Sequence, residues 1–440
     1  MGSSFHASRV CGGMGIRVRP SRLFYGWWIV GAGLGLQALA TALLFHAFGT
    51  YVVLLEREFG WSRAVLAGAF SLARVEDGLL GPAQGWMLDR FGPRAVIRVG
   101  VVVLGVGFVL FSRVDSLATF YATFMIMAVG AGLAGFLSIT TSIVNWFTRR
   151  RALATGLALL GTAVGGFAQP AVVGALEAYG WRDVAVASGV IVIVFGLPLA
   201  QLMRHRPEPY GLLPDGLPPD KAAEARSVGG VYDEQVDYTV REAIRTRAFW
   251  LISGAHASGV LVVTVVTVHF VPHVNTGLGY SLSTAALLLT LMTTMNLVGR
   301  VIGGYLGDRA NSRALIIVSL LGHAAALLFL TFAQSLWMVV AFAILNGLAW
   351  GARVPVLIAL RAEYFGARSY GKIMGFSSLI VMIGSVSGPL LAGLSYDVTG
   401  SYTIGFTAVA LLAAAGSLLM AATPPPRPIV RPTSPTAGHG

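Results

Sequence analysis

Residues 296–313 read NLVGRVIGGYLGDRANSR, and this stretch decides the fold because it places an arginine inside an apolar run. Arg300 lies eight residues before Asp308. At about 1.5 Å per residue, Arg300 would lie roughly 12 Å inside a bilayer whose surface is at Asp308. A buried arginine costs several kcal/mol unless it faces water, a partner or a ligand, so we expect Arg300 to be functional.

The composition is that of a membrane protein. The chain has 440 residues, of which 55% are hydrophobic and 11% charged, and its mean hydropathy is +0.74. These values are too apolar for an ordinary soluble domain. The net charge of +12 lies in short clusters between apolar runs, a pattern typical of membrane topology and not of nucleic-acid binding. The single cysteine, Cys11, excludes an intrachain disulfide and a cysteine-based metal site, and we expect no cofactor.

Apolar runs long enough to cross about 30 Å of hydrocarbon follow one another along the chain. The first six are 26–54, 62–86, 95–112, 117–144, 152–174 and 184–203. The second six are 248–273, 283–306, 314–333, 337–360, 373–394 and 403–422. They predict an all-α membrane protein with a tail (1–24), a first six-helix bundle (25–203), a linker (204–246), a second six-helix bundle (247–423) and a disordered tail (424–440). Thr239 and Glu242 resemble a capping box and predict a short amphipathic helix in the linker.

The distribution of Lys and Arg predicts the orientation. The two tails, the linker and the loops on the same side hold 24 of these residues, whereas the opposite side holds four. Positive residues collect on the cytoplasmic side of membrane proteins, so we expect both termini and the linker to be cytoplasmic.

An internal repeat relates the two halves. GWMLDRFGPR at 85–94 recurs as GYLGDRANSR at 304–313, displaced by 219 positions. The same displacement relates Gly156, Gly165, Pro170 and Gly174 to Gly375, Gly384, Pro389 and Gly393. Two halves of equal orientation, joined by a cytoplasmic loop, are typical of transporters that rock two bundles about a central site.

The Gly-x-x-x-Asp-Arg-x-Gly-x-Arg pattern at 85–94 resembles the signature of the Major Facilitator Superfamily, and 304–313 resembles its weaker second copy. Within that family, YGWW at 25–28, WFTRRRALATG at 146–156 and Asn296-x-x-x-Arg300 resemble the bacterial monocarboxylate transporter and oxalate/formate antiporter branch. The resemblance implies twelve transmembrane helices in two pseudo-symmetric bundles, placed in a bacterial cytoplasmic (inner) membrane and functional as a monomer. It also implies transport of small organic anions, such as lactate-like monocarboxylates, with a proton or a counter-anion.

The sequence departs from the animal monocarboxylate transporters at two places. They carry an aspartate four residues before the arginine, where this chain has Asn296, and a lysine in the first span, which this chain lacks. Their protonation relay therefore does not transfer to this chain.

Several polar residues inside spans are candidates for substrate binding. Arg300 would contact a carboxylate, or else pair with an acid of the second span. Asn296 lies one turn away on the same face. Arg353 would contact the substrate or pair with Glu76. His269 would contact the substrate or respond to pH near the outer end of its span. His269 and His273 lie four residues apart on one helix face, but no third ligand is in register with them, so we do not expect a metal site.

Two further charged groups complete the predicted machinery. Arg74 and Asp77, three residues apart, share a helix face and would pair, whereas Glu76 points elsewhere. Asp77 and Glu76 are the candidates for proton coupling. A cytoplasmic gate is predicted at Asp89, Arg90, Arg94, Asp308 and Arg309.

The sequence leaves three function classes open. The first is a secondary transporter or exchanger of organic anions, and the second is an exporter of a drug-like or aromatic compound. The third, a membrane receptor or enzyme, is disfavoured because the sequence shows no nucleophile or metal constellation and no sizeable soluble domain. No phosphate-binding Gly-x-x-x-x-Gly-Lys-Ser/Thr motif occurs, so ATP is not the expected energy source.

Overall fold

The computed structural model describes residues 24–216 and 237–424, and these residues fold into helices joined by short turns. The first half contains α1 (Gly26–Ala40), η1 (Thr41–Phe45), α2 (Phe48–Phe59), α3 (Arg63–Phe91), α4 (Pro93–Phe111), α5 (Leu117–Ala134), α6 (Phe136–Trp146), α7 (Arg151–Leu159), α8 (Gly161–Phe167), α9 (Gln169–Tyr179) and α10 (Trp181–Leu202). The linker contains η2 (Glu208–Tyr210), η3 (Pro214–Gly216) and α12 (Val240–Arg245). The second half contains α13 (Arg247–Pro272), η4 (His273–Gly277), α14 (Leu282–Gly307), α15 (Ser312–Thr331), α16 (Leu336–Phe365), α17 (Tyr370–Thr399) and α18 (Thr403–Ala421). The predicted tails, 1–24 and 424–440, lie almost wholly outside the described residues.

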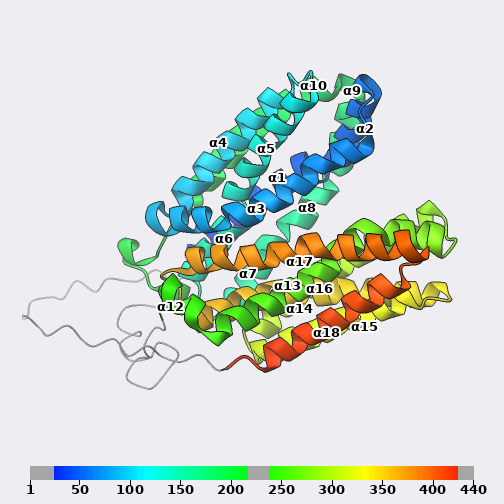
Figure 1. The fold of residues 1–440 in the computed structure, drawn as a ribbon. Coiled ribbons are helices and arrows are strands. Elements are labelled where there is room, and N and C mark those ends of the chain that lie inside the picture. Colours follow the sequence, from blue (N-terminus) through cyan, green and yellow to red (C-terminus); the bar gives the residue numbers. More distant parts are fainter. Residues whose placement is uncertain (1–23, 217–236, 425–440) are drawn as a thin grey trace, which may run out of the picture.

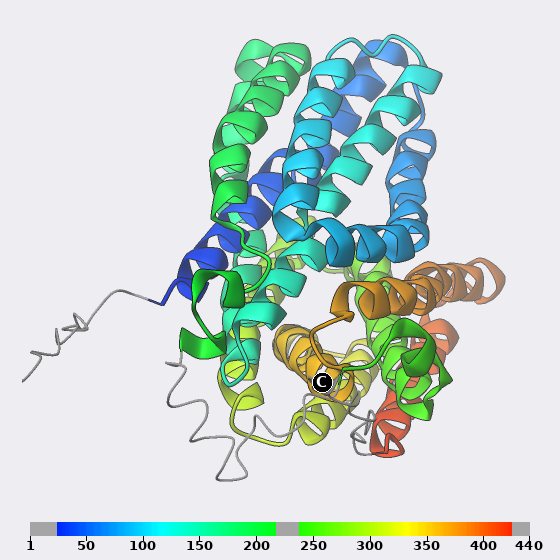
Figure 2. The ribbon, with the colours of Figure 1, turned by 90° about the vertical axis from the view of Figure 1, so that its left-hand side faces the viewer.

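The helices form two bundles, as the sequence predicts. The bundles lie close together at the end that carries α12 and diverge towards the opposite end (Figure 1). We call these the closed end and the open end. The halves meet mainly along two helix pairs, α3 with α17 and α7 with α14, and α16 also packs on α7. α3 and α17 lie side by side in both views (Figures 1 and 2). Both pairs are related by the 219-residue repeat, so the interface has the same internal symmetry as the sequence.

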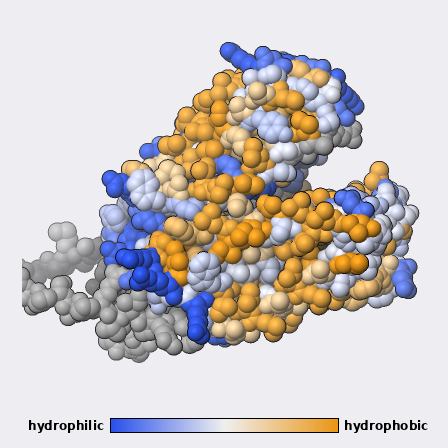
Figure 3. All heavy atoms as spheres, viewed as in Figure 1, coloured by the Kyte–Doolittle hydropathy of each residue, from blue (hydrophilic) through white to orange (hydrophobic). Residues whose placement is uncertain are grey.

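The outer surface fits a lipid environment. Hydrophobic residues cover the sides of both bundles, and hydrophilic ones gather at their ends (Figure 3). Within the described residues, eleven helical segments are long and apolar enough to cross a membrane. α3 completes the twelve: it spans 29 residues but carries Arg74, Glu76 and Asp77 in its interior. These charges lower its hydropathy, and a charged helix at membrane depth indicates that one face meets protein or water.

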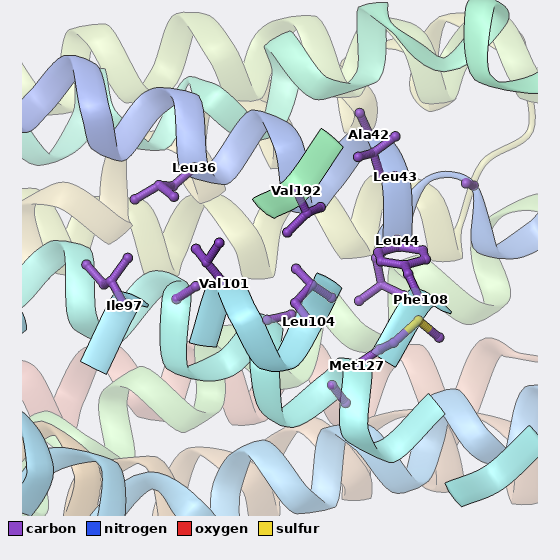
Figure 4. Close-up of a cluster of buried hydrophobic side chains, with 14 of the residues drawn as sticks. Leu36, Ala42, Leu43, Leu44, Ile97, Val101, Leu104, Phe108, Met127 and Val192 are labelled. Atoms are coloured by element: carbon purple, nitrogen blue, oxygen red, sulfur yellow. The ribbon is translucent and has the colours of Figure 1, made fainter. Parts of the chain in front are cut away.

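Apolar packing holds each bundle together separately. In the first bundle, Leu104, Phe108 and Met127 pack with Leu44 and Val192, side chains from α4, α5, η1 and α10 (Figure 4). A second cluster joins α13, α14, α15, α16 and α18 in the other bundle. These large clusters each lie inside one bundle, whereas a smaller one, which contains Val144, Ile358 and Tyr370, joins the two bundles. Most of the close apolar packing therefore lies within the bundles and not between them.

Several spans are interrupted where they pass the molecule's centre. α1 continues through a short π-helix, η1, before α2. The fourth span breaks at Gly135, between α5 and α6. The fifth span is divided into α7, α8 and α9. Such breaks often lie at functional sites in membrane proteins, because they aim backbone and side chains at a cavity.

Candidate functional site

A cavity of about 730 Å³ lies between the two bundles. It contains residues of both halves, and its polar lining residues are Gln37, Thr41, His46, Arg74, Asp77, Gln84, Thr162, His256, Thr293, Asn296, Arg300, Arg361, Ser377 and Ser378. The space-filling view shows the hollow between the bundles towards the open end (Figure 3). A cavity of this size is typical of small-molecule sites.

Arg300 reaches across the cavity from α14 to the first bundle. Its Nη1 donates to the backbone oxygen of Leu159 and to Thr162 Oγ1, the latter at 2.7 Å. Its Nε is buried without a hydrogen-bond partner. Arg300 therefore binds neutral oxygens, and the predicted alternative, an ion pair with an acid of α3, is not formed in this conformation.

Arg361 is a second arginine in the cavity, and the sequence reading missed it. The expected span ended at residue 360, whereas α16 continues to Phe365 and buries Arg361. Its Nη2 donates to Ser377 Oγ at 2.7 Å and to His256 Nδ1 at 3.2 Å. Arg361 lies about two helical turns after Arg353, and this spacing could have predicted that the two arginines share a helix face.

The charged cluster of α3 lies on the opposite wall. Arg74 Nη1 is 3.3 Å from Asp77 Oδ2, the local pair that their spacing predicts. Arg74 also lies over the rings of Phe45 and Phe70, at 5.1 and 4.8 Å. Asp77 lines the cavity, whereas Glu76 does not and has a buried, unpartnered Oε2.

The other candidate binding residues are divided between the cavity and the second bundle's interior. Asn296 lines the cavity, and its buried Nδ2 has no partner, so it could donate to a ligand. Arg353 does not line the cavity, and its Nη1 donates to the backbone oxygen of His256 at 3.3 Å. His269 is also outside the cavity lining, with Nε2 3.0 Å from the backbone oxygen of Pro389.

The electrostatic balance of the cavity is positive. Ion pairs among the described residues include Arg74 with Asp77, Arg182 with Glu58, and Lys372 with Asp89, and none of these involves Arg300 or Arg361. The Arg74–Asp77 pair is neutral overall, so Arg300 and Arg361 are left without a carboxylate. A fully buried guanidinium (Arg361) and a partly buried one (Arg300), neither with an acidic partner, favour an anionic ligand over a neutral one.

The closed end is held by two symmetric carboxylate contacts. Asp308 Oδ1 and Oδ2 accept from the backbone N–H groups of Ala152 and Leu153, at 2.8 and 3.1 Å, at the start of α7. Its repeat counterpart, Asp89, lies at the start of α17, with Oδ2 3.7 Å from Lys372 Nζ. Each carboxylate thus meets the positive end of a helix in the other half.

The arginines of the predicted gate stay within their own halves. Arg90 lies over Trp86 and Phe91, and Arg309 lies over Tyr305. Arg94 donates to the backbone oxygens of Met203 and Gln201. The ionic and hydrogen-bonding contacts described here between the halves at this end therefore come from the two aspartates, the helix ends and Lys372.

The comparisons with a family profile, with related sequences and with solved structures agree with one another. The family profile described as Major Facilitator Superfamily matches residues 33–311 and 264–439. Monocarboxylate transporter 13 of Rattus norvegicus is 27% identical over 414 residues, which cover 93% of this chain and 91% of that protein. The uncharacterised MFS-type transporter YhjX of Escherichia coli is 27% identical over 335 residues, 73% of this chain and 76% of that one.

A solved structure shows the same fold. The human organic anion transporter MFSD10 matches with a TM-score of 0.67 at 17% identity, over 90% of this chain and 99% of that one.

Proposed function

The chain belongs to the Major Facilitator Superfamily, and on that premise we propose that it moves small organic anions, such as lactate-like monocarboxylates, across a membrane by alternating access. The observation that carries the proposal is that two guanidinium groups, Arg300 and Arg361, line one cavity in which the carboxylate of Asp77 is paired with Arg74 and not with them. Burying a guanidinium in a low-dielectric interior costs several kcal/mol, and a carboxylate from the substrate would offset that cost. The name of the rat relative agrees with this chemistry.

The cavity's remaining surface sets the expected size and shape of the substrate. Phe45, Phe136 and Trp350 line it beside the polar groups. An acid with a small aliphatic or aromatic body would place its carboxylate between the arginines and its body against these rings. The alternative, export of a neutral aromatic compound, would leave the two arginines without a partner.

Alternating access would use the interface described above. At the closed end, α3 packs on α17 and α7 packs on α14. We place this end at the cytoplasm because most Lys and Arg residues lie on that side. Rocking of the bundles would break both helix contacts and open the cavity to the other side.

Uptake into proteoliposomes tests the proposal. The full-length protein would be offered radiolabelled lactate, pyruvate, benzoate and oxalate, with and without an acid-outside gradient, and with and without an internal counter-anion. We expect the acids to enter and their neutral amides not to enter. Uptake of neutral aromatic compounds that carboxylates do not inhibit would contradict the proposal. Dependence on the gradient or on the internal anion distinguishes symport from exchange.

The pKa of Asp308 predicts how pH changes the relative populations of the two conformations. Burial raises the pKa of Asp308 to about 6 from 3.8, although the N–H groups of Ala152 and Leu153 favour the charged form. A proton therefore binds more tightly when this end is closed than when Asp308 faces water. Lowering the pH through about 6 should stabilise the closed end, and raising it should remove this stabilisation.

Spin labels at the open end would measure this shift. Tyr179 and Val398, exposed and related by the repeat, would be replaced by cysteine in a Cys11→Ser background. Acidification should increase the population with the longer label distance, and Asp308→Asn should weaken this response because asparagine does not titrate. A shift of the wild type towards the shorter distance at low pH would refute this role of Asp308.

A further inference from the structure

His256 lies between two arginines at the edge of the cavity. It belongs to α13 and lines the cavity, where Arg361 Nη2 is 3.2 Å from its Nδ1. On its other side, Arg353 Nη1 donates to its backbone oxygen at 3.3 Å. Both arginines come from α16, so one helix holds His256 from two sides.

The hydrogen bond to Arg361 fixes the protonation state of His256. A guanidinium group has only donors, so Nδ1 must accept, and the imidazole is then neutral with its proton on Nε2. An imidazolium carries a proton on both nitrogens. The Arg361 hydrogen bond and protonation of Nδ1 are therefore mutually exclusive.

Within the part of the chain that the structure describes, no carboxylate pairs with His256 or with its two arginine partners. The charged and titratable groups facing it or its partners are Arg353 and Arg361 from α16, Tyr370 from α17 and His323 from α15. Across the cavity are Arg300 of α14 and the Arg74–Asp77 pair of α3. α18 has no titratable residue. The charged residues of α12 lie before the start of α13, more than about 13 Å along the helix from His256.

We propose that His256 takes up the proton that accompanies the anion, an inference that rests on the proposed transport of organic anions. A bound carboxylate would draw Arg361 away from His256, and Nδ1 would then bind a proton that enters from the bulk solution through the cavity, so that no hydroxide is left behind. The imidazolium charge is offset by the carboxylate, so the cavity keeps the net charge it has when empty. Anion and proton then bind cooperatively, each strengthening the other.

His256 fits this role better than Asp77. The Asp77 carboxylate is paired with Arg74 at 3.3 Å, and anion binding at Arg300 or Arg361 does not require this pair to open. His256, by contrast, loses the hydrogen bond that blocks its protonation as soon as Arg361 turns to a ligand.

Calorimetry of lactate binding tests the inference without relying on transport. Titration of the purified full-length protein at about pH 7.5, in buffers of different ionisation enthalpy, gives the number of protons taken up per lactate. We expect about one for the wild type and about none for His256→Gln, because lactate and proton are linked only through this imidazole. The glutamine oxygen can still accept from Arg361, and His256→Asn provides a second variant if the first does not fold. The matched control, His273→Gln, alters a histidine of the same bundle that contacts Leu330 outside the cavity, and it should keep the wild-type proton number.

The outcomes separate this inference from the function on which it rests. If the wild type does not bind lactate, the proposed function fails. If His256→Gln binds lactate and still takes up the proton, the role of His256 fails although the function stands. Loss of proton uptake in Asp77→Asn but not in His256→Gln would assign the proton to Asp77 and overturn the inference. In proteoliposomes, His256→Gln should lose stimulation by an acid gradient and keep lactate exchange.

Discussion

Arg300→Lys should lower lactate uptake by about 100-fold, or about 2.7 kcal/mol, although the positive charge is retained. A planar guanidinium can grip a carboxylate with two parallel hydrogen bonds, whereas an ammonium offers one point of charge. The buried and unpartnered Nε of Arg300 is available for such a contact. The measurement is initial uptake into proteoliposomes, together with lactate affinity of the purified protein. Arg182→Lys, which changes an arginine outside the cavity, is the matched control.

A second variant distinguishes substrate binding from a purely structural role of Arg300. In this conformation Arg300 also joins the halves through Thr162 Oγ1, at 2.7 Å. If that contact were its main role, Thr162→Val would reduce uptake as much as Arg300→Lys. We expect a much smaller reduction for Thr162→Val. A well-folded Arg300→Lys protein with wild-type lactate affinity would show that Arg300 is not the anion contact.

The fold follows from the sequence because a membrane allows few alternatives. Backbone groups in hydrocarbon must be paired within each segment, so every long apolar run becomes a helix. The repeat then relates the halves, and structure and sequence agree on which helices are counterparts: α3 packs on α17 as α14 packs on α7. The break before α9 coincides with Pro170, a residue that predicts a kink. η1 and the break between α5 and α6 lie in apolar runs whose composition alone does not show where a helix bends.

The site could be predicted only in part because sequence gives the depth of a residue better than its direction. Arg300, Asn296 and the Arg74–Asp77 pair lie at the cavity, where the cost of burying polar groups places them. Arg353 is at similar depth, but its guanidinium packs against Gly259 inside the second bundle, where a Cβ would meet it. The rotation of a helix about its axis is set by such packing, which no single sequence displays.

Arg361 and His256 line the cavity although the sequence did not predict them as binding residues. Arg361 lies just beyond the expected end of its span at residue 360, yet its side chain turns inward to His256 and Ser377. The 219-residue repeat makes His256 the counterpart of Gln37, and both residues line the cavity. Polar residues at symmetric positions of two apolar helices are candidates for a shared central site.

Gly375→Ala should move most molecules out of the conformation described here. A Cβ at Gly375 would fall on the backbone carbonyl of Gly81 and within 3.0 Å of Pro82 Cα, so α3 and α17 could not keep their contact. Neither obstacle is a flexible side chain that could turn aside. Overpacking of this kind costs about 1–3 kcal/mol, which shifts a two-state equilibrium by roughly 5- to 150-fold. Because the clash exists only while the closed end is closed, the protein should open that end and close the other.

The distance between spin labels at Tyr179 and Val398 measures the result, since it shortens when the open end closes. Gly174→Ala is the matched control: it adds the same methyl group to a membrane helix where nothing lies within 4 Å of the new Cβ. The control should keep the wild-type distance distribution, and Gly375→Ala should show mainly the shorter distance. Gly156, the counterpart of Gly375, meets the backbone oxygen of Arg300 at 2.6 Å, so Gly156→Ala should act in the same direction. If both interface variants keep the long distance while folding normally, the two helix pairs do not separate during transport, and the rocking of rigid bundles is wrong.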